Sequence, residues 1–126
     1  MANADAGKLL VIDDDDLTRA AIAGVLEEHG YRVRGAGDGL QGLDVARTWR
    51  PHLILLDLVL PRMNGWEFVD AYRRQVGRDG HILVMTGLPR VATLPTGISA
   101  GEVLRKPLDF EALLQLVAYS LRAAAA

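Results

Sequence analysis

The sequence predicts a single α/β domain built on a parallel five-stranded sheet with helices on both faces. Three observations predict this class. The chain has 126 residues, the size of one domain. Short unbroken apolar runs alternate with segments of helical periodicity. Polar residues follow most of the apolar runs. Alternation of this kind implies βαβ units with right-handed crossovers and a doubly wound sheet.

Short apolar runs mark the strands. The runs at 9–12, 53–56 and 82–85 are unbroken, which is typical of strands buried on both faces of a parallel sheet. The segment 31–35 alternates apolar and polar residues, and this favours an edge strand with one wet face. The short segment 103–104 is the candidate for the other edge.

Helical periodicity fills most of the gaps. Apolar residues at helical spacing predict helices around 68–76 and 110–121, the latter with Asp109 as its N-cap. A weaker helix is expected over 38–49, where two glycines lower the propensity. The first helix is expected to bury half of its wheel, formed by Leu17, Ala21, Ile22, Val25 and Leu26.

The stretch before the last strand departs from this pattern. Pro89, Pro95 and Gly97 fall where the fourth helix should run, and an interior proline costs a helix roughly 3 kcal/mol. We therefore expect a short, displaced or mobile fourth helix.

Composition limits the functions that are open. With 14 basic and 16 acidic residues the net charge is −2, so direct nucleic-acid binding by electrostatics is disfavoured. The absence of cysteine excludes disulfides and thiolate chemistry. No run approaches the roughly 18 apolar residues of a membrane span, and we expect a cytoplasmic protein. Residues 8–122 are expected to form the domain, with 1–7 and 123–126 as flexible ends.

Polar side chains follow four of the five predicted strands. In chain order they are Asp13, Asp14, Asp57, Thr86 and Lys106. The carboxyl ends of parallel strands meet at one edge, where open α/β sheets bind their ligands. Asp15 and Asp16 come next in the chain and are interpreted as caps of the first helix.

The chemistry of this edge suits a metal and a phosphoryl group. Asp13, Asp14 and Asp57 repel one another unless a hard cation such as Mg²⁺ lies between them. A carboxylate can also form an acyl phosphate, so Asp57 is a candidate metal ligand, nucleophile or both. The Lys106 ammonium and the Thr86 hydroxyl would then face phosphoryl oxygens.

In this order and spacing, the residues resemble the receiver domain of two-component response regulators. The resemblance spans about 8–121 and rests on four motifs, namely the acidic pair after Leu10-Val11-Ile12, the stretch DLVLPRMNG at 57–65, Met85-Thr86-Gly87, and Lys106-Pro107. It implies a flavodoxin-like strand order of 2-1-3-4-5. All four motifs occur in the order that the family requires.

The resemblance implies a role in signal transduction. Asp57 would accept a phosphoryl group, in an Mg²⁺-dependent reaction, from a sensor histidine kinase or a histidine phosphotransfer protein. Such a chain is a signalling phosphoprotein that catalyses only its own phosphorylation and dephosphorylation. The implied metal ligands are Asp13 (through water), Asp14, Asp57 and the main-chain carbonyl of Val59, and the phosphoryl-binding residues are Thr86 and Lys106.

Several positions depart from the usual pattern of this family. Val103 occupies the place of the switch aromatic, three residues before Lys106. This change and the irregular fourth helix alter the face that many relatives use to dimerise, so we expect an atypical output face and a monomer or weak dimer. Val59 and Leu88 are apolar where side chains tune attack by water, so slow autodephosphorylation is expected.

Two other functions stay open at this point. A receiver-like module could bind its partners without phosphorylation, as the changes around Val103 suggest. The residues Asp14, Asp16 and Thr18 match the DxDxT signature of haloacid-dehalogenase-type phosphatases. In that case Asp14 would be the nucleophile, and Asp57 would be dispensable.

Overall fold

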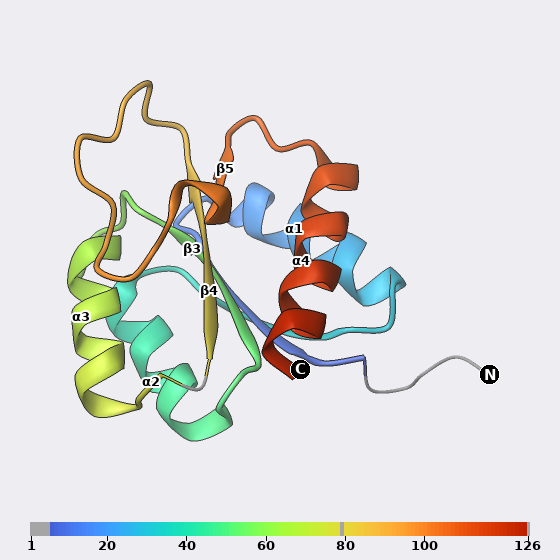
Figure 1. Cartoon of the computed structure of the whole chain (residues 1–126), viewed down its shortest axis with the longest axis horizontal. Coiled ribbons are helices and arrows are strands. Elements are labelled where there is room, and N and C mark those ends of the chain that lie inside the picture. The colour runs from blue at the N-terminus through green and yellow to red at the C-terminus, as the bar shows by residue number, and fades with distance from the viewer. Residues whose placement is uncertain (1–5, 79, 126) are drawn as a thin grey trace.

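The computed structural model describes residues 6–78 and 80–125, which form a parallel five-stranded sheet covered on both faces (Figure 1). In chain order the elements are β1 (Lys8–Ile12), α1 (Asp16–Glu28), β2 (Arg32–Ala36), α2 (Gly39–Trp49), β3 (Leu53–Asp57), α3 (Gly65–Gln75), β4 (His81–Thr86), the 3₁₀ helix η1 (Ala100–Glu102), β5 (Val103–Arg105) and α4 (Phe110–Ala125). The strand order is β2-β1-β3-β4-β5 and every pairing is parallel. The predicted fold class and strand order are confirmed.

Two apolar layers enclose the sheet. Helices α2 and α3 cover one face, and α1 and α4 cover the other (Figure 1). Along β1, Leu10 and Ile12 pack in the α2–α3 layer, whereas Leu9 and Val11 pack in the α1–α4 layer. This alternation is the two-residue period of a strand. It explains why β1 contains the unbroken apolar run 9–12 and β3 the run 53–56.

The chain between β4 and β5 contains no α-helix in the described residues. The segment 87–99 runs as a loop past the start of α3 (Figure 1). Its main chain is held by a 2.7 Å hydrogen bond from Trp66 Nε1 to the carbonyl of Thr93 and by the guanidinium of Arg105 on the carbonyl of Leu88. The predicted irregularity is confirmed. In place of the expected short or displaced fourth helix, the described residues between β4 and β5 contain only the single 3₁₀ turn η1, so four of the five strands are followed by an α-helix; Pro89 and Pro95 interrupt this segment.

The predicted apolar stripe of the first helix is wrong at its start. Ile22 and Leu26 are fully buried, but Leu17 is 82% exposed and Ala21 is also exposed. The first turns of α1 lie beside the chain that follows β5, where they line an open groove. The stripe therefore continues from the core onto the surface.

The described part of the chain ends with helix α4. Helix α4 continues to Ala125, beyond the boundary expected at residue 122. Residues 1–5 and 126 lie outside the described part, and the assignment of 1–7 and 123–126 as flexible ends stays a prediction. Among the described residues, no helix is both long enough and apolar enough to span a bilayer.

Candidate functional site

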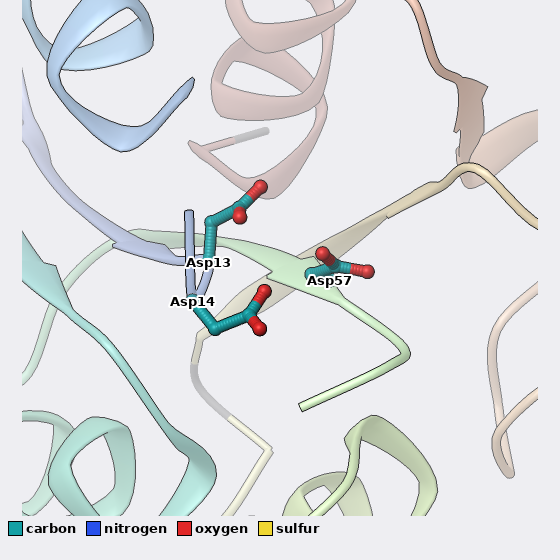
Figure 2. A group of neighbouring side chains, drawn as sticks. All are labelled: Asp13, Asp14 and Asp57. Carbon is teal, nitrogen blue, oxygen red and sulfur yellow. The ribbon is translucent and has the colours of Figure 1, made fainter. Parts of the chain in front are cut away.

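Adjacent strands bring the predicted carboxylates together. Ile12 of β1 is in register with Leu56 of β3, so the residues that follow them, Asp13 and Asp57, reach the same edge of the sheet. Together with Asp14 they each offer a carboxylate oxygen within 4.8 Å of the others (Figure 2). Asp13 is fully buried and Asp57 is 5% exposed, whereas Asp14 is exposed. The cluster is therefore shielded from solvent at Asp13 and Asp57 and open to solvent at Asp14.

Lys106, which follows the edge strand β5, also contacts this cluster. Its Nζ donates to Asp13 Oδ2 at 2.7 Å and to Asp57 Oδ2 at 2.9 Å. Its main-chain N–H donates to the carbonyl of Thr86 at 2.8 Å, which continues the pairing of β5 with β4. One ammonium thus lies between two carboxylates, and the group of three aspartates retains an excess of negative charge.

Burial and this ammonium act on the carboxyls in opposite directions. Burial raises the pKa of Asp57, and the hydrogen bond from Lys106 only partly opposes it. For Lys106, burial alone would lower the pKa, but the hydrogen bonds to Asp13 and Asp57 outweigh it and the pKa is raised. The cation is therefore firmly charged. Asp57, however, is ionised at a cost that a further positive group would relieve.

Thr86 ends β4 with a buried hydroxyl. Its Oγ1 accepts a 3.0 Å hydrogen bond from the N–H of Leu88, which leaves the hydroxyl proton available to an acceptor in the site. The next residue is Gly87, where an added Cβ would lie 3.9 Å from Lys106 Cβ. A side chain at this position would therefore begin in ordinary van der Waals contact with the stem of Lys106.

The loop 58–64 leads from Asp57 to α3. The N–H of Val59 donates to Asp57 Oδ1 at 3.2 Å, and the Val59 side chain is 55% exposed. Asn64 and Glu67 then form a reciprocal capping box at the start of α3. Because this capping box starts α3 at Gly65, the loop is short and the chain returns to the core within a few residues of Asp57.

The remaining acids at the start of α1 have structural roles. Asp15 is the N-cap and accepts from the N–H and hydroxyl of Thr18, and the side-chain hydrogen bond with Thr18 lowers the pKa of Asp15. Arg19, which the sequence did not single out, donates to the main-chain carbonyl of Asp13 at 2.6 Å and to Asp16. The spacing of Asp16 and Arg19 was the available signal, since it places them on one helix face. These contacts hold the chain around Asp13 in place through a residue that is not part of the carboxylate cluster.

The donor set fits a hard divalent cation. Carboxylate and carbonyl oxygens are the ligands that Mg²⁺ prefers, and Mg²⁺ commonly takes only one or two protein carboxylates with waters and a phosphate. Here the exposed Asp14 faces two buried carboxylates that share a single ammonium. The excess negative charge and the open side match such an ion. The cluster lacks the nitrogen and sulfur ligands typical of zinc sites.

Comparison with known proteins agrees with this geometry. The model of the family described as response regulator receiver domain matches residues 9–118. "Response regulator MprA" from Mycobacterium avium (strain 104) is 37% identical over 117 residues, covering 91% of this chain and 51% of the relative. The protein of that name from Mycobacterium tuberculosis is also 37% identical. The chain spans about half the length of the curated relatives it matches.

Solved structures give the same result. A CheY-like receiver domain protein from Methanospirillum hungatei has a TM-score of 0.83 at 26% identity, covering 94% of this chain and 95% of its own. The chemotaxis protein CheY4 of Vibrio cholerae has a TM-score of 0.77 at 31% identity, covering 90% and 97%. Taken together with the fold and the acidic edge, these matches show that the chain belongs to the family of response regulator receiver domains, which are signalling domains of two-component systems.

Proposed function

We propose that this chain accepts a phosphoryl group on Asp57 from a phosphohistidine donor, with Mg²⁺ as cofactor. The observation that supports this most strongly is the joint placement of a buried carboxylate, an ammonium that contacts it at 2.9 Å and a second buried carboxylate on the same ammonium. The first test is intact mass after incubation with acetyl phosphate and Mg²⁺. One phosphoryl adduct, absent when Mg²⁺ is chelated, is the expected result.

The transfer is an in-line displacement at phosphorus. An oxygen of the Asp57 carboxylate forms the new O–P bond, the N–P bond of the donor breaks, and the donor imidazole keeps the electron pair and takes up a proton. Asp13, Asp14, Asp57 and the Val59 carbonyl would hold Mg²⁺. When bound, the ion neutralises charge on the phosphoryl oxygens and the carboxylates.

The chain's own groups position the phosphoryl oxygens. Lys106 already contacts Asp57, and its ammonium can pair with an oxygen of the group that Asp57 acquires. Thr86 keeps its hydroxyl proton free and would donate it to another oxygen. Positioning and charge neutralisation of this kind account for most of the catalysis in phosphoryl transfer.

A groove beside this site offers a surface for the donor. It has a volume of about 620 Å³ and lies between the start of α1 and the chain after Lys106. Its lining is mainly apolar, with Leu17, Ala21, Pro107, Leu108 and Phe110. Because Lys106 belongs to both groove and site, a helix that carries a phosphohistidine and packs its apolar face here would present that residue to Asp57.

Leu17→Glu is expected to separate protein donors from small ones. Leu17 is 82% exposed and lines the groove, so a charge there should weaken docking of an apolar helix. The loss of one such contact is worth about 1–3 kcal/mol, and transfer from phosphohistidine proteins encoded in the same genome should fall roughly tenfold or more. Phosphorylation by acetyl phosphate should be unchanged.

Tyr119→Glu is the control for that comparison. Tyr119 is 62% exposed on α4 and does not line the groove. Transfer from the protein donor should stay at the wild-type rate. Equal losses in the two variants, or a loss with acetyl phosphate as well, would contradict docking in this groove.

Slow loss of the phosphoryl group is a further part of the proposal. Hydrolysis requires a water to attack phosphorus, which releases phosphate and restores the Asp57 carboxylate. Val59 donates its N–H to Asp57 and Leu88 donates its N–H to Thr86, so both flank the site, and their apolar side chains cannot orient that water. We expect Val59→Asn to hydrolyse roughly tenfold faster, because its amide can hold a water. The decay of the intact-mass adduct after removal of the donor measures this, and an unchanged or slower decay would be contrary to the proposal.

The phosphatase alternative gains little from the structure. Asp14, its required nucleophile, is exposed and is not among the residues that Lys106 contacts. The family match places the chain among signalling domains instead. A cytoplasmic location, the absence of nucleic-acid and membrane contacts, and a monomeric or weakly dimeric state stay predictions.

A further inference from the structure

The loop that follows Asp57 is pressed against the start of α2. A Cβ placed on Gly39 would overlap the carbonyl oxygen of Met63 and would lie 2.7 Å from Met63 Cβ. Gly39 is buried, so a side chain there has no exit to solvent. Only a residue without a side chain lets the two backbones meet at this point.

An ion pair holds the same part of the loop. Arg62 Nε lies 3.2 Å from Asp38 Oδ2, while Asp38 Oδ1 accepts from the N–H of Gln41 at 2.8 Å. Asp38 thus caps α2 with one oxygen and binds the loop with the other. Arg62 has a φ of 68°, a left-handed conformation that non-glycine residues keep only where their surroundings hold it.

The inner side of the loop is fixed to the site. The N–H of Gly65 donates to the carbonyl of Leu58 at 2.9 Å, and a Cβ on Gly65 would lie 2.7 Å from Leu58 Cα. The N–H of Val59 donates to Asp57. Because the loop is short and is held at both sides, a displacement of Met63 must be absorbed by the few residues between it and Leu58.

We propose that Gly39 and the Asp38–Arg62 ion pair are positioning residues for the cation site. They touch neither Asp57 nor a phosphoryl group. They set the position of Met63, and through the short loop they set the Val59 carbonyl relative to Asp57. Helix α2 is a firm reference for this purpose, since Leu43 and Ala46 anchor it in the core. The inference rests on the proposed function, because the Val59 carbonyl is one of the proposed metal ligands.

Binding of Mn²⁺, followed by the loss of the electron paramagnetic resonance signal of the free ion, tests this directly. Gly39→Ala should bind Mn²⁺ roughly tenfold more weakly than the wild type, the size of effect seen when groups that orient ligands are changed. Gly80→Ala is the matched control. A Cβ there would overlap Tyr72 Oη next to the amino end of β4, so it disturbs packing away from the acidic edge. Its Mn²⁺ affinity should stay within about twofold of the wild type.

Arg62→Asn gives a second test that does not depend on a tight steric contact. Asparagine tolerates the left-handed backbone, and Arg62 is largely exposed. Arg62 belongs to the loop that follows Asp57, and removal of its positive charge would by itself strengthen cation binding rather than weaken it. Positioning predicts the opposite sign, a fall of roughly two- to fivefold.

Two results would overturn the inference. One is a Gly39→Ala variant that binds Mn²⁺ as tightly as the wild type although its melting temperature is lowered as in Gly80→Ala. The contact between Gly39 and Met63 would then contribute to packing alone. The other is unchanged or tighter binding in Arg62→Asn. Failure of the proposed function is seen separately in the wild type, which would then form no phosphoryl adduct with acetyl phosphate and Mg²⁺, or would bind no Mn²⁺ at all.

Discussion

Asp57→Asn is expected to abolish the phosphoryl adduct that acetyl phosphate and Mg²⁺ leave on the wild type. The amide offers a neutral oxygen that does not attack phosphorus. The fold should be retained, because the amide has nearly the volume of the carboxylate and removes a buried charge. Burial raises the pKa of Asp57, so the ionised group costs stability at neutral pH. Intact mass and a melting curve on the same sample measure both effects.

Asp14→Asn separates the roles within the cluster. It keeps the nucleophile and removes an exposed carboxylate, so the adduct should form more slowly and should need more Mg²⁺. An adduct that survives Asp57→Asn but is lost in Asp14→Asn would favour the phosphatase alternative. An absence of adduct in the wild type with acetyl phosphate, phosphoramidate and phosphohistidine proteins alike would favour a module that works unphosphorylated.

Lys106→Met is expected to destabilise the domain more than substitution of any ordinary surface lysine. The change leaves Asp13, which is fully buried, and Asp57 without their shared ammonium. Loss of one partner of a buried ion pair costs about 3–5 kcal/mol. Because Lys106 is 23% exposed, we expect about 2–3 kcal/mol at pH 7 without divalent cations. Urea denaturation measures it, and Lys106→Arg, which keeps a cation, should recover part of the loss.

The pH dependence of this loss has a definite sign. The pKa of Asp57 is already raised above its usual value of 3.8 by burial, and loss of the ammonium removes the main group that opposes the rise. The ionised Asp57 carboxyl therefore destabilises Lys106→Met most at neutral pH. As the pH falls through the raised pKa of Asp57 towards 3.8, this carboxyl takes up a proton and the deficit shrinks. A deficit that stays constant as the pH falls from 7 to 3.8 would contradict this account.

Much of the site could be predicted because it depends on strand ends. Asp13, Asp57 and Thr86 directly follow or end buried apolar runs, and in a parallel sheet this fixes the edge at which they meet. Lys106 could be added because one residue separates it from the strand 103–104. Periodicity and strand direction contain this information, and neither requires knowledge of tertiary contacts.

The contacts that support the site could not be predicted in this way. Arg19 contacts the main-chain carbonyl of Asp13, and Arg62 contacts Asp38. Neither contact follows from the spacing of these residues in the sequence, because each depends on how the folded chain places its loops. The error at Leu17 has a similar origin. Periodicity assigns a residue to a helix face, but it does not show whether the sheet extends far enough to cover that face.

A loop at 87–99 in place of a helix lowers the free energy that is needed to displace this segment. A helix moves as a cooperative unit, because displacing one turn strains the hydrogen bonds of its neighbours. Here two side chains hold the segment at Leu88 and Thr93, and Val91, Leu94 and Ile98 pack it against the α2–α3 layer. Segments with few such contacts open locally with free energies below that of global unfolding. Each 1.4 kcal/mol that a ligand contributes changes a population ratio tenfold. We therefore expect a small electrostatic change at Thr86, two residues from the first anchor, to redistribute the conformations of this loop before those of the rest of the domain.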